Sequence, residues 1–147
     1  MTKLYYRGMM ADNGKPKIGR HARCLGIRPN IDIDVDLVPK DSIDECGYLQ
    51  PASNHDTERE MVEVAVRNTK GMSVSLSIDA LPDFRKPPAF GGIGRDPLWQ
   101  IDSDKITGDL EAVRDSTTHV SIMPKVTMLL TQYEAALAST SDAWELV

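Results

Sequence analysis

Aromatic residues are scarce in this 147-residue chain, and there is no excess of positive charge. Aromatic side chains make up 5% of the residues, which is too few for a surface on which bases stack. The net charge of −5 also disfavours a nucleic-acid interface, because such an interface needs clustered cations to neutralise phosphates. We therefore do not expect the protein to bind nucleic acid.

Long apolar runs are also lacking. No stretch approaches the roughly 18 consecutive apolar residues of a membrane span. Residues 1–7 do not form the apolar segment of a signal peptide. These features predict a protein that has no membrane partner and is cytoplasmic, with delivery to another cell requiring a dedicated secretion system.

Cysteine is limited to Cys24 and Cys46. Their number and spacing fit neither a disulfide framework nor a close metal-binding pair. The sequence also contains no H-x-x-x-H motif and no cluster of cysteine with histidine that would indicate zinc. We expect buried or free thiols and no metal site.

The rest of the composition is ordinary for a globular protein. Hydrophobic residues make up 41% and charged residues 27% of the chain. A chain of 147 residues is long enough for a real core, so the simplest organisation is one domain over residues 1–147. Both strand and helix patterns occur along it, which predicts an α+β fold.

The stretch that follows Gly71 carries the most informative pattern. Residues 72–78 alternate apolar side chains with Ser73, Ser75 and Ser77. Because side chains alternate faces along a strand, one face should be apolar and the other should carry three hydroxyls. Gly71 stands where a turn or a close ligand approach would need a residue without a Cβ. Small hydroxyls in a row can line a polar cleft, so we place the functional site on this strand.

Alternation and β-branched or aromatic residues predict further strands. They are expected at residues 3–9, 31–37, 98–101, 110–115 and 118–123. Within 31–37, aliphatic residues alternate with Asp32, Asp34 and Asp36. An EF-hand loop does not fit these aspartates, because its glycine and glutamate positions hold other residues. We expect a solvated acidic face.

Two helices are predicted. Thr57 and Glu60 form a capping box for a helix over residues 57–69, although the β-branched valines in this segment also suit a strand. Pro124 should open the second helix, near the C-terminus. Its apolar stripe consists of Val126, Leu129, Leu130, Tyr133 and Leu137. The tail after it should dock Trp144 on the body.

A loop rich in proline and glycine occupies residues 81–97. Its four prolines and three glycines rule out regular structure. Phe84 and Phe90, the only phenylalanines of the chain, both lie in it and should pack against the body. We expect an ordered lid or wall. It is not a dinucleotide fingerprint, because Pro97 occupies the place of the third glycine.

Three predicted strands each carry one residue suited to chemistry, namely Arg7, Ser73 and His119. A guanidinium group binds phosphate through a bidentate fork, and a histidine is a titratable base. Simpler roles stay open: a surface or salt-bridged arginine, a structural histidine and a solvated serine face. No serine-nucleophile motif supports a hydrolase triad.

Four blocks of the chain, in this order, resemble a type VI secretion toxin family whose fold is similar to that of ADP-ribosyltransferase toxins. They are residues 4–7, 71–74, 99–102 with Leu110, Arg114 and Asp115, and 118–124 followed by Met128. The resemblance implies an ADP-ribosyltransferase-like fold, in which two small packed β-sheets form a cleft flanked by a few helices. It also implies a bacterial effector toxin that uses NAD as its substrate and either transfers ADP-ribose or hydrolyses NAD. The implied partners are a protein acceptor and a cognate immunity or antitoxin protein.

The same resemblance implies roles for individual residues. Arg7 would hold a phosphate, and Ser73 would order the floor near the nicotinamide ribose and keep Arg7 oriented. His119 would position the ribose or act as a polar catalytic group. Arg7, Gly71, Ser73 and Ser75 would together bind the NAD.

The chain departs from the family pattern at two points. Met72 stands where the family tends to have threonine. No glutamate stands in a Gln-x-Glu or Glu-x-Glu strand motif, although the wider transferase toxins use such a glutamate beside the reacting ribose. Glu111 and Asp115 are the acids nearest to the His119 strand. The alternative function is therefore a non-enzymatic nucleotide- or protein-binding module on the same fold.

Overall fold

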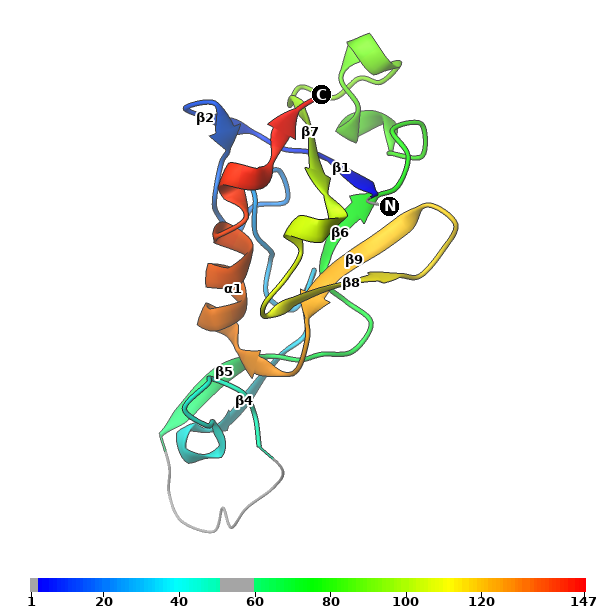
Figure 1. Cartoon of the computed structure of the whole chain (residues 1–147). Coiled ribbons are helices and arrows are strands. Elements are labelled where there is room, and N and C mark those ends of the chain that lie inside the picture. The colour runs from blue at the N-terminus through cyan, green and yellow to red at the C-terminus, as the bar shows by residue number, and fades with distance from the viewer. Residues whose placement is uncertain (1–2, 51–59) are drawn as a thin grey trace.

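The computed structural model describes residues 3–50 and 60–147, which form three β-sheets and one α-helix (Figure 1). The strands are β1 (Leu4–Gly8), β2 (Ala11–Asp12), β3 (Lys15–Pro16), β4 (Val35–Pro39), β5 (Met61–Ala65), β6 (Met72–Ser75), β7 (Leu98–Asp102), β8 (Leu110–Arg114), β9 (His119–Pro124), β10 (Met128–Leu129) and β11 (Glu145–Leu146). The helix α1 spans Leu130–Ala138. This arrangement confirms the predicted α+β class. None of the helices in the described ranges is long and apolar enough to cross a membrane.

The largest sheet has the strand order β11-β7-β1-β6-β9-β8, and its centre is a weak joint. β1 and β6 share a single residue pair, Tyr6 opposite Ser75. In contrast, β1 pairs with β7 at all five of its residues, and β6 pairs with β9 at all four. The sheet therefore consists of two three-stranded halves that part on either side of one pair.

The buried face of the large sheet follows from the alternation in its strands. Met72 and Val74 of β6 are buried and lie opposite Ile122 and Val120 of β9. Tyr133 of α1 joins the same core cluster, because the apolar side of the helix packs on this face. The serines of β6 point away from it. The main core therefore lies between the sheet and α1, which leaves the opposite face of β6 for other contacts.

The tail is docked as the sequence predicts. Trp144 is 4% exposed and belongs to the core cluster. Its indole Nε1 donates a hydrogen bond of 3.1 Å to the Thr140 hydroxyl, which satisfies the polar end of the buried ring. The tail then continues into β11, which pairs with the outer side of β7.

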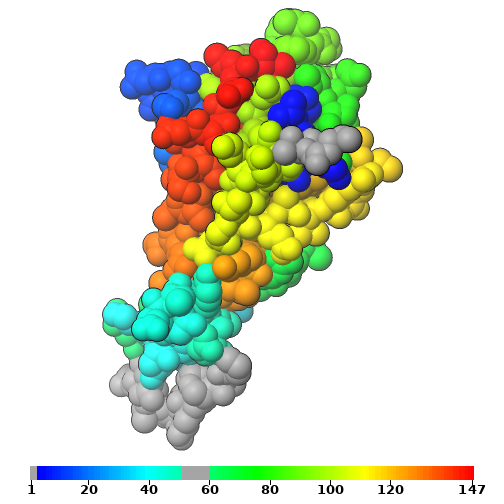
Figure 2. Space-filling view, viewed as in Figure 1, coloured from blue at the N-terminus to red at the C-terminus, as the bar shows by residue number. Residues whose placement is uncertain are grey.

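The predicted helix over residues 57–69 is wrong. Residues 61–65 of that segment form β5, while residues 57–59, which carry the start of the predicted capping box, lie outside the described residues. β5 is the middle strand of the three-stranded sheet β10-β5-β4, with Val64 and Ala65 buried. Its β-branched valines lose rotamer freedom in a helix but pack well on a pleated surface. Figure 2 shows the cyan residues of this sheet region projecting from the main body.

The C-terminal helix starts later than predicted. Pro124 ends β9, and Met128–Leu129 forms β10, which pairs with β5. Only from Leu130 does the chain turn into α1. Val126 is therefore outside the helix, and it is 38% exposed. The buried helical stripe consists of Leu130, Tyr133 and Leu137.

The acidic stretch is only partly a strand, because β4 begins at Val35. Asp32 binds Arg28 in an i,i+4 ion pair of 3.0 Å. Asp34 accepts hydrogen bonds from Asn68, at 2.5 Å, and from Lys70, at 3.1 Å. Two of the three aspartates thus hold specific partners, so the predicted acidic face is not simply solvated.

Candidate functional site

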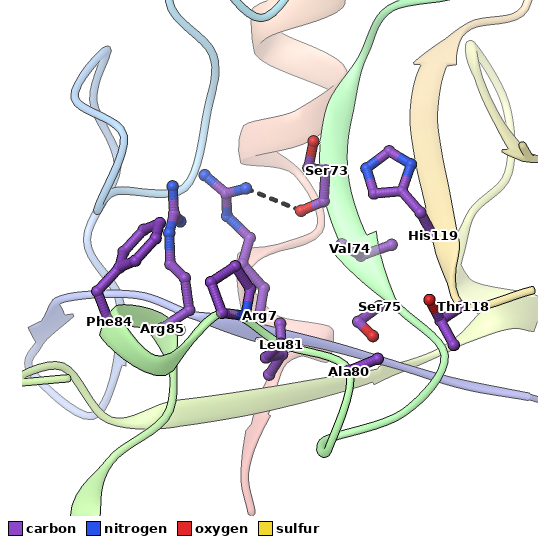
Figure 3. A pocket seen from close by; sticks show the side chains of 12 residues that line it. Arg7, Ser73, Val74, Ser75, Ala80, Leu81, Phe84, Arg85, Thr118 and His119 are labelled. Carbon is purple, nitrogen blue, oxygen red and sulfur yellow. Dashed lines mark hydrogen bonds between the residues drawn. The ribbon is translucent and has the colours of Figure 1, made fainter. Parts of the chain in front are cut away.

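A pocket of about 270 Å³ opens where β1 and β6 part. Arg7 of β1, Ser73 and Ser75 of β6 and His119 of β9 all line it (Figure 3). Residues between 80 and 85, from the proline-rich loop, form another part of its lining. Four residues that the sequence singles out on three strands therefore meet in one pocket.

Gly71 does not line this pocket. It lies in a neighbouring pocket of about 170 Å³, which Ser73 and His119 also line. A Cβ on Gly71 would stand 2.5 Å from the main-chain oxygen of Ile122, so the glycine allows β9 to approach closely. The structure thus explains Gly71 by backbone packing, and Ser73 and His119 line both pockets.

Arg7 is buried, with 6% of the residue exposed, and its guanidinium binds main-chain oxygens. Nη1 donates to the Ser73 carbonyl at 2.8 Å, as drawn in Figure 3. Nη2 donates to the carbonyls of Ala22 and Cys24, at 3.0 and 3.3 Å. Arg7 is therefore neither a surface residue nor salt-bridged in the described part of the chain. It fastens β1 to β6 and to the 22–24 segment.

The burial of the Arg7 guanidinium is only partly compensated by hydrogen bonds. Its Nε is the one buried side-chain nitrogen or oxygen without a hydrogen-bond partner among the described residues. Burial, and then the nearby charge of Arg85, lower the pKa of Arg7 to about 10. The guanidinium is still charged at neutral pH. An anion bound near Arg7 would compensate the positive charge of its guanidinium, which has no ion-pair partner among the described residues.

The proline-rich loop is an ordered wall, as predicted. The loop folds back on itself, since the main-chain nitrogens of Ile93 and Gly94 donate to the carbonyls of Asp83 and Lys86, at 2.9 and 2.7 Å. Gly8 of β1 lies directly beneath it. A Cβ on Gly8 would stand 2.5 Å from the Arg85 main-chain oxygen, so the absence of a side chain there lets the wall rest on β1.

The predicted packing of the two phenylalanines is wrong for Phe84, which is 64% exposed. Its ring instead contacts the guanidinium of Arg85, 5.5 Å from the ring centre. Phe90 is half-buried and lines a separate pocket. Arg85 itself lines the site pocket, and sequence reasoning missed it. The available signal was a cation beside an aromatic residue in a loop expected to form the wall.

The imidazole of His119 is oriented by Asp115. Nδ1 of the ring lies 2.7 and 2.8 Å from the two carboxylate oxygens. A carboxylate accepts hydrogen bonds, so Nδ1 carries the hydrogen, and in the neutral imidazole Nε2 is then the acceptor. Asp115, one of the two acids nearest to the His119 strand in sequence, thus has a structural partner in the site.

The serines of β6 differ in the freedom of their hydroxyls. Ser75 is buried, and its Oγ donates to the Ser77 carbonyl at 2.6 Å and accepts from the Ser77 nitrogen at 3.1 Å. Ser73 is exposed, and its hydroxyl makes no hydrogen bond within the described residues. The hydroxyl that is available to a ligand is therefore that of Ser73, whereas Ser75 shapes the turn that follows the strand.

The family model described as the Tse2 ADP-ribosyltransferase toxin matches residues 3–144, which is nearly the whole chain. The chain belongs to this family. Tse2 is a type VI secretion toxin, so the family resemblance drawn from the four sequence blocks is confirmed. Searches against curated proteins and against solved structures returned no match.

The Tse2-family chain provides no glutamate for the pocket among its described residues. Glu111, the other acid considered from sequence, forms an ion pair of 2.6 Å with Arg67. The side chains of β6 and β9 and of the residue before β9 that offer hydrogen-bonding groups to the pocket include Ser73, Thr118 and the Asp115-oriented His119.

Proposed function

We propose that this Tse2-family domain binds NAD in the pocket between β1 and β6 and cleaves it, transferring ADP-ribose to an acceptor or to water. The observation that carries the proposal is the convergence of Arg7, Ser73 and His119 on one pocket at the joint of the two sheet halves. Membership of an ADP-ribosyltransferase toxin family supports the same chemistry.

The residues present fit such a substrate. The buried, unpaired Nε of Arg7 marks one end of the pocket as positive, which suits a pyrophosphate. Ser73 and His119 offer hydrogen-bonding groups for ribose hydroxyls. A volume of about 270 Å³ is small beside ligand pockets of roughly 300–1,000 Å³, so the pocket would enclose part of the dinucleotide. The adjoining pocket that shares Ser73 and His119 gives the acceptor a separate approach.

In the proposed reaction the bond between ribose C1′ and the nicotinamide nitrogen breaks, and nicotinamide leaves with the electron pair. Positive charge develops on the ribose. The acceptor or a water molecule forms the new bond to C1′ and gives its proton to Nε2 of His119. Asp115 keeps the imidazole in the tautomer that accepts this proton. Ser73 holds the ribose, and Arg7 holds β6 in place through the Ser73 carbonyl.

The direct test measures nicotinamide released from NAD by the purified protein, with Ser73→Ala and His119→Ala as variants. Loss of a positioned acid–base group costs about 10²–10⁴-fold in rate, so we expect at least a hundredfold loss for His119→Ala. His21→Ala is the matched control, because His21 is exposed and outside the pocket. If the wild-type protein neither bound NAD nor released nicotinamide from it, the proposal would be overturned.

The second candidate function is a nucleotide- or protein-binding module without catalysis. It is favoured by one observation, namely that no glutamate lines the pocket in the described ranges. Calorimetry with NAD separates the two candidates. Binding to the wild type without any nicotinamide release would support the module.

As a family of this kind implies, we propose a toxic effector that is delivered to another cell and neutralised by a cognate immunity protein. Expression in bacteria tests this role. We expect the wild type to arrest growth and the His119→Ala and Arg7→Ala variants to be tolerated at equal protein levels. Equal growth with all three proteins would argue against a toxin.

A further inference from the structure

The family resemblance implies that Arg7 binds a phosphate of the substrate. In the structure, however, both terminal nitrogens of this guanidinium donate hydrogen bonds to the protein main chain. Three main-chain carbonyls, those of Ala22, Cys24 and Ser73, accept hydrogen bonds from its two terminal nitrogens. With 6% of the residue exposed, Arg7 contributes its charge from beneath the surface of the pocket. Its unpartnered Nε is itself buried, so direct contact with a ligand requires a donor that is both free and accessible.

Arg85 provides that donor. It lines the pocket, and Figure 3 shows its guanidinium beside that of Arg7. Its Nη1 donates to the Ala22 carbonyl at 3.1 Å, and the described residues supply no further hydrogen bond and no ion pair to it. The guanidinium carbon also lies over the ring of Phe84, 5.5 Å from the ring centre, in a cation–π contact. Arg85 is therefore anchored at one nitrogen while the rest of its planar fork stays available.

The neighbouring acids form their hydrogen-bonded ion pairs with other arginines. Asp96 is bound in a bidentate pair by Arg23, at 2.7 and 2.6 Å. Asp32 is bound in the same way by Arg28, at 3.0 and 3.3 Å. Each aspartate thus has its own arginine. Burial lowers the pKa of Arg85, and it outweighs the opposing attraction of the Asp32 and Asp96 charges.

We propose that Arg85 binds the pyrophosphate of the dinucleotide directly, and that Arg7 is a positioning residue that holds the Ser73 main chain and adds a buried charge. The proposal rests on the proposed function, because it takes the substrate to be NAD. Two adjacent cations without carboxylate partners match the two charges of a pyrophosphate. The wall that carries Arg85 is held against β1 at Gly8, so the fork keeps a fixed place relative to Ser73.

The test is calorimetric titration of the full chain with ADP-ribose. Arg85→Gln should weaken binding by roughly ten- to a hundredfold, as expected for a lost charge-assisted contact. Arg85→Lys keeps the charge but loses the planar fork, so its affinity for ADP-ribose should lie between those of the wild type and Arg85→Gln. Arg95→Gln is the matched control, because Arg95 is an exposed arginine of the same loop outside the pocket. Thermal unfolding of each variant checks that the fold is intact.

The salt dependence of the affinity for ADP-ribose distinguishes a direct ionic contact of Arg85 from a purely structural role of this residue. Between about 20 and 200 mM salt, the wild type and Arg95→Gln should lose affinity for ADP-ribose more steeply than Arg85→Gln, because one screened contact is gone. Unchanged affinity in a folded Arg85→Gln would overturn the assignment while NAD cleavage still stands. Equal salt slopes in the wild type and Arg85→Gln would also overturn it. Absence of both ADP-ribose binding and NAD cleavage in the wild type would overturn the proposed function itself.

Discussion

The hydroxyl of Tyr133 offers a quantitative test of how the scaffold holds the serine strand. It accepts a hydrogen bond from the Met72 nitrogen at 3.2 Å and donates to the Ile122 carbonyl at 2.5 Å. The residue is fully buried, and burial raises the pKa of the phenol. Tyr133→Phe keeps the ring and removes both bonds. Each of the two buried main-chain groups left unsatisfied costs about 1–3 kcal/mol, so we expect a loss of at least about 2 kcal/mol in unfolding free energy.

Urea titration followed by tryptophan fluorescence measures this loss, because Trp99 and Trp144 are both buried. The melting temperature should fall by about 5–10 °C for a protein of this size. Tyr6→Phe is the control, since the Tyr6 hydroxyl has no hydrogen bond in the described ranges and should change the free energy by less than about 0.5 kcal/mol. Equal effects of the two substitutions would refute the bridging role of Tyr133.

Three further predictions concern the wall, the thiols and acid stability. Gly8→Ala should lower the unfolding free energy in urea by about 1–3 kcal/mol, because its Cβ would meet the Arg85 oxygen; no change would contradict this close contact. A thiol reagent should label Cys46 at once and Cys24, which is 5% exposed, only on unfolding; rapid labelling of both would contradict the burial. The pKa of Asp109 is held below its ordinary value of 3.8, first by a hydrogen bond from a tyrosine hydroxyl. Its stabilisation is therefore full above about pH 4 and lost as pH falls, so Asp109→Asn should show a smaller drop in melting temperature on acidification than the wild type.

Strands that bury one face could be predicted from sequence, because apolar and polar residues alternate along them. β1, β6 and β8 lie within stretches predicted as strands, and β7 and β9 each extend one residue beyond theirs. β5 could not be predicted in this way. Its capping signal and its valines point to different structures, and the choice between them is made by pairing with β4 and β10, which are distant in sequence.

The candidate site was also predictable only where its residues lie on regular strands. Alternation placed Arg7, Ser73 and His119 on separate strands, and their meeting in one pocket agrees with the prediction that they share a cleft. Two of the three partners of Arg7 were not predictable, because the Ala22 and Cys24 carbonyls come from a segment without regular structure. Arg85 was missed because the path of its loop depends on internal hydrogen bonds that no periodic pattern records.

The single residue pair between β1 and β6 has a consequence for folding thermodynamics. Few main-chain hydrogen bonds oppose separation of the two three-stranded halves, so this joint is a natural boundary for sub-global opening. A ligand that contacts both halves binds only the closed form and stabilises it by mass action. At a concentration a hundred times its dissociation constant, the gain is about 2.7 kcal/mol. A bound substrate would then add contacts between β1 and β6 where the strands themselves share one residue pair. Amide hydrogen exchange along β1 and β6 would therefore slow when it binds.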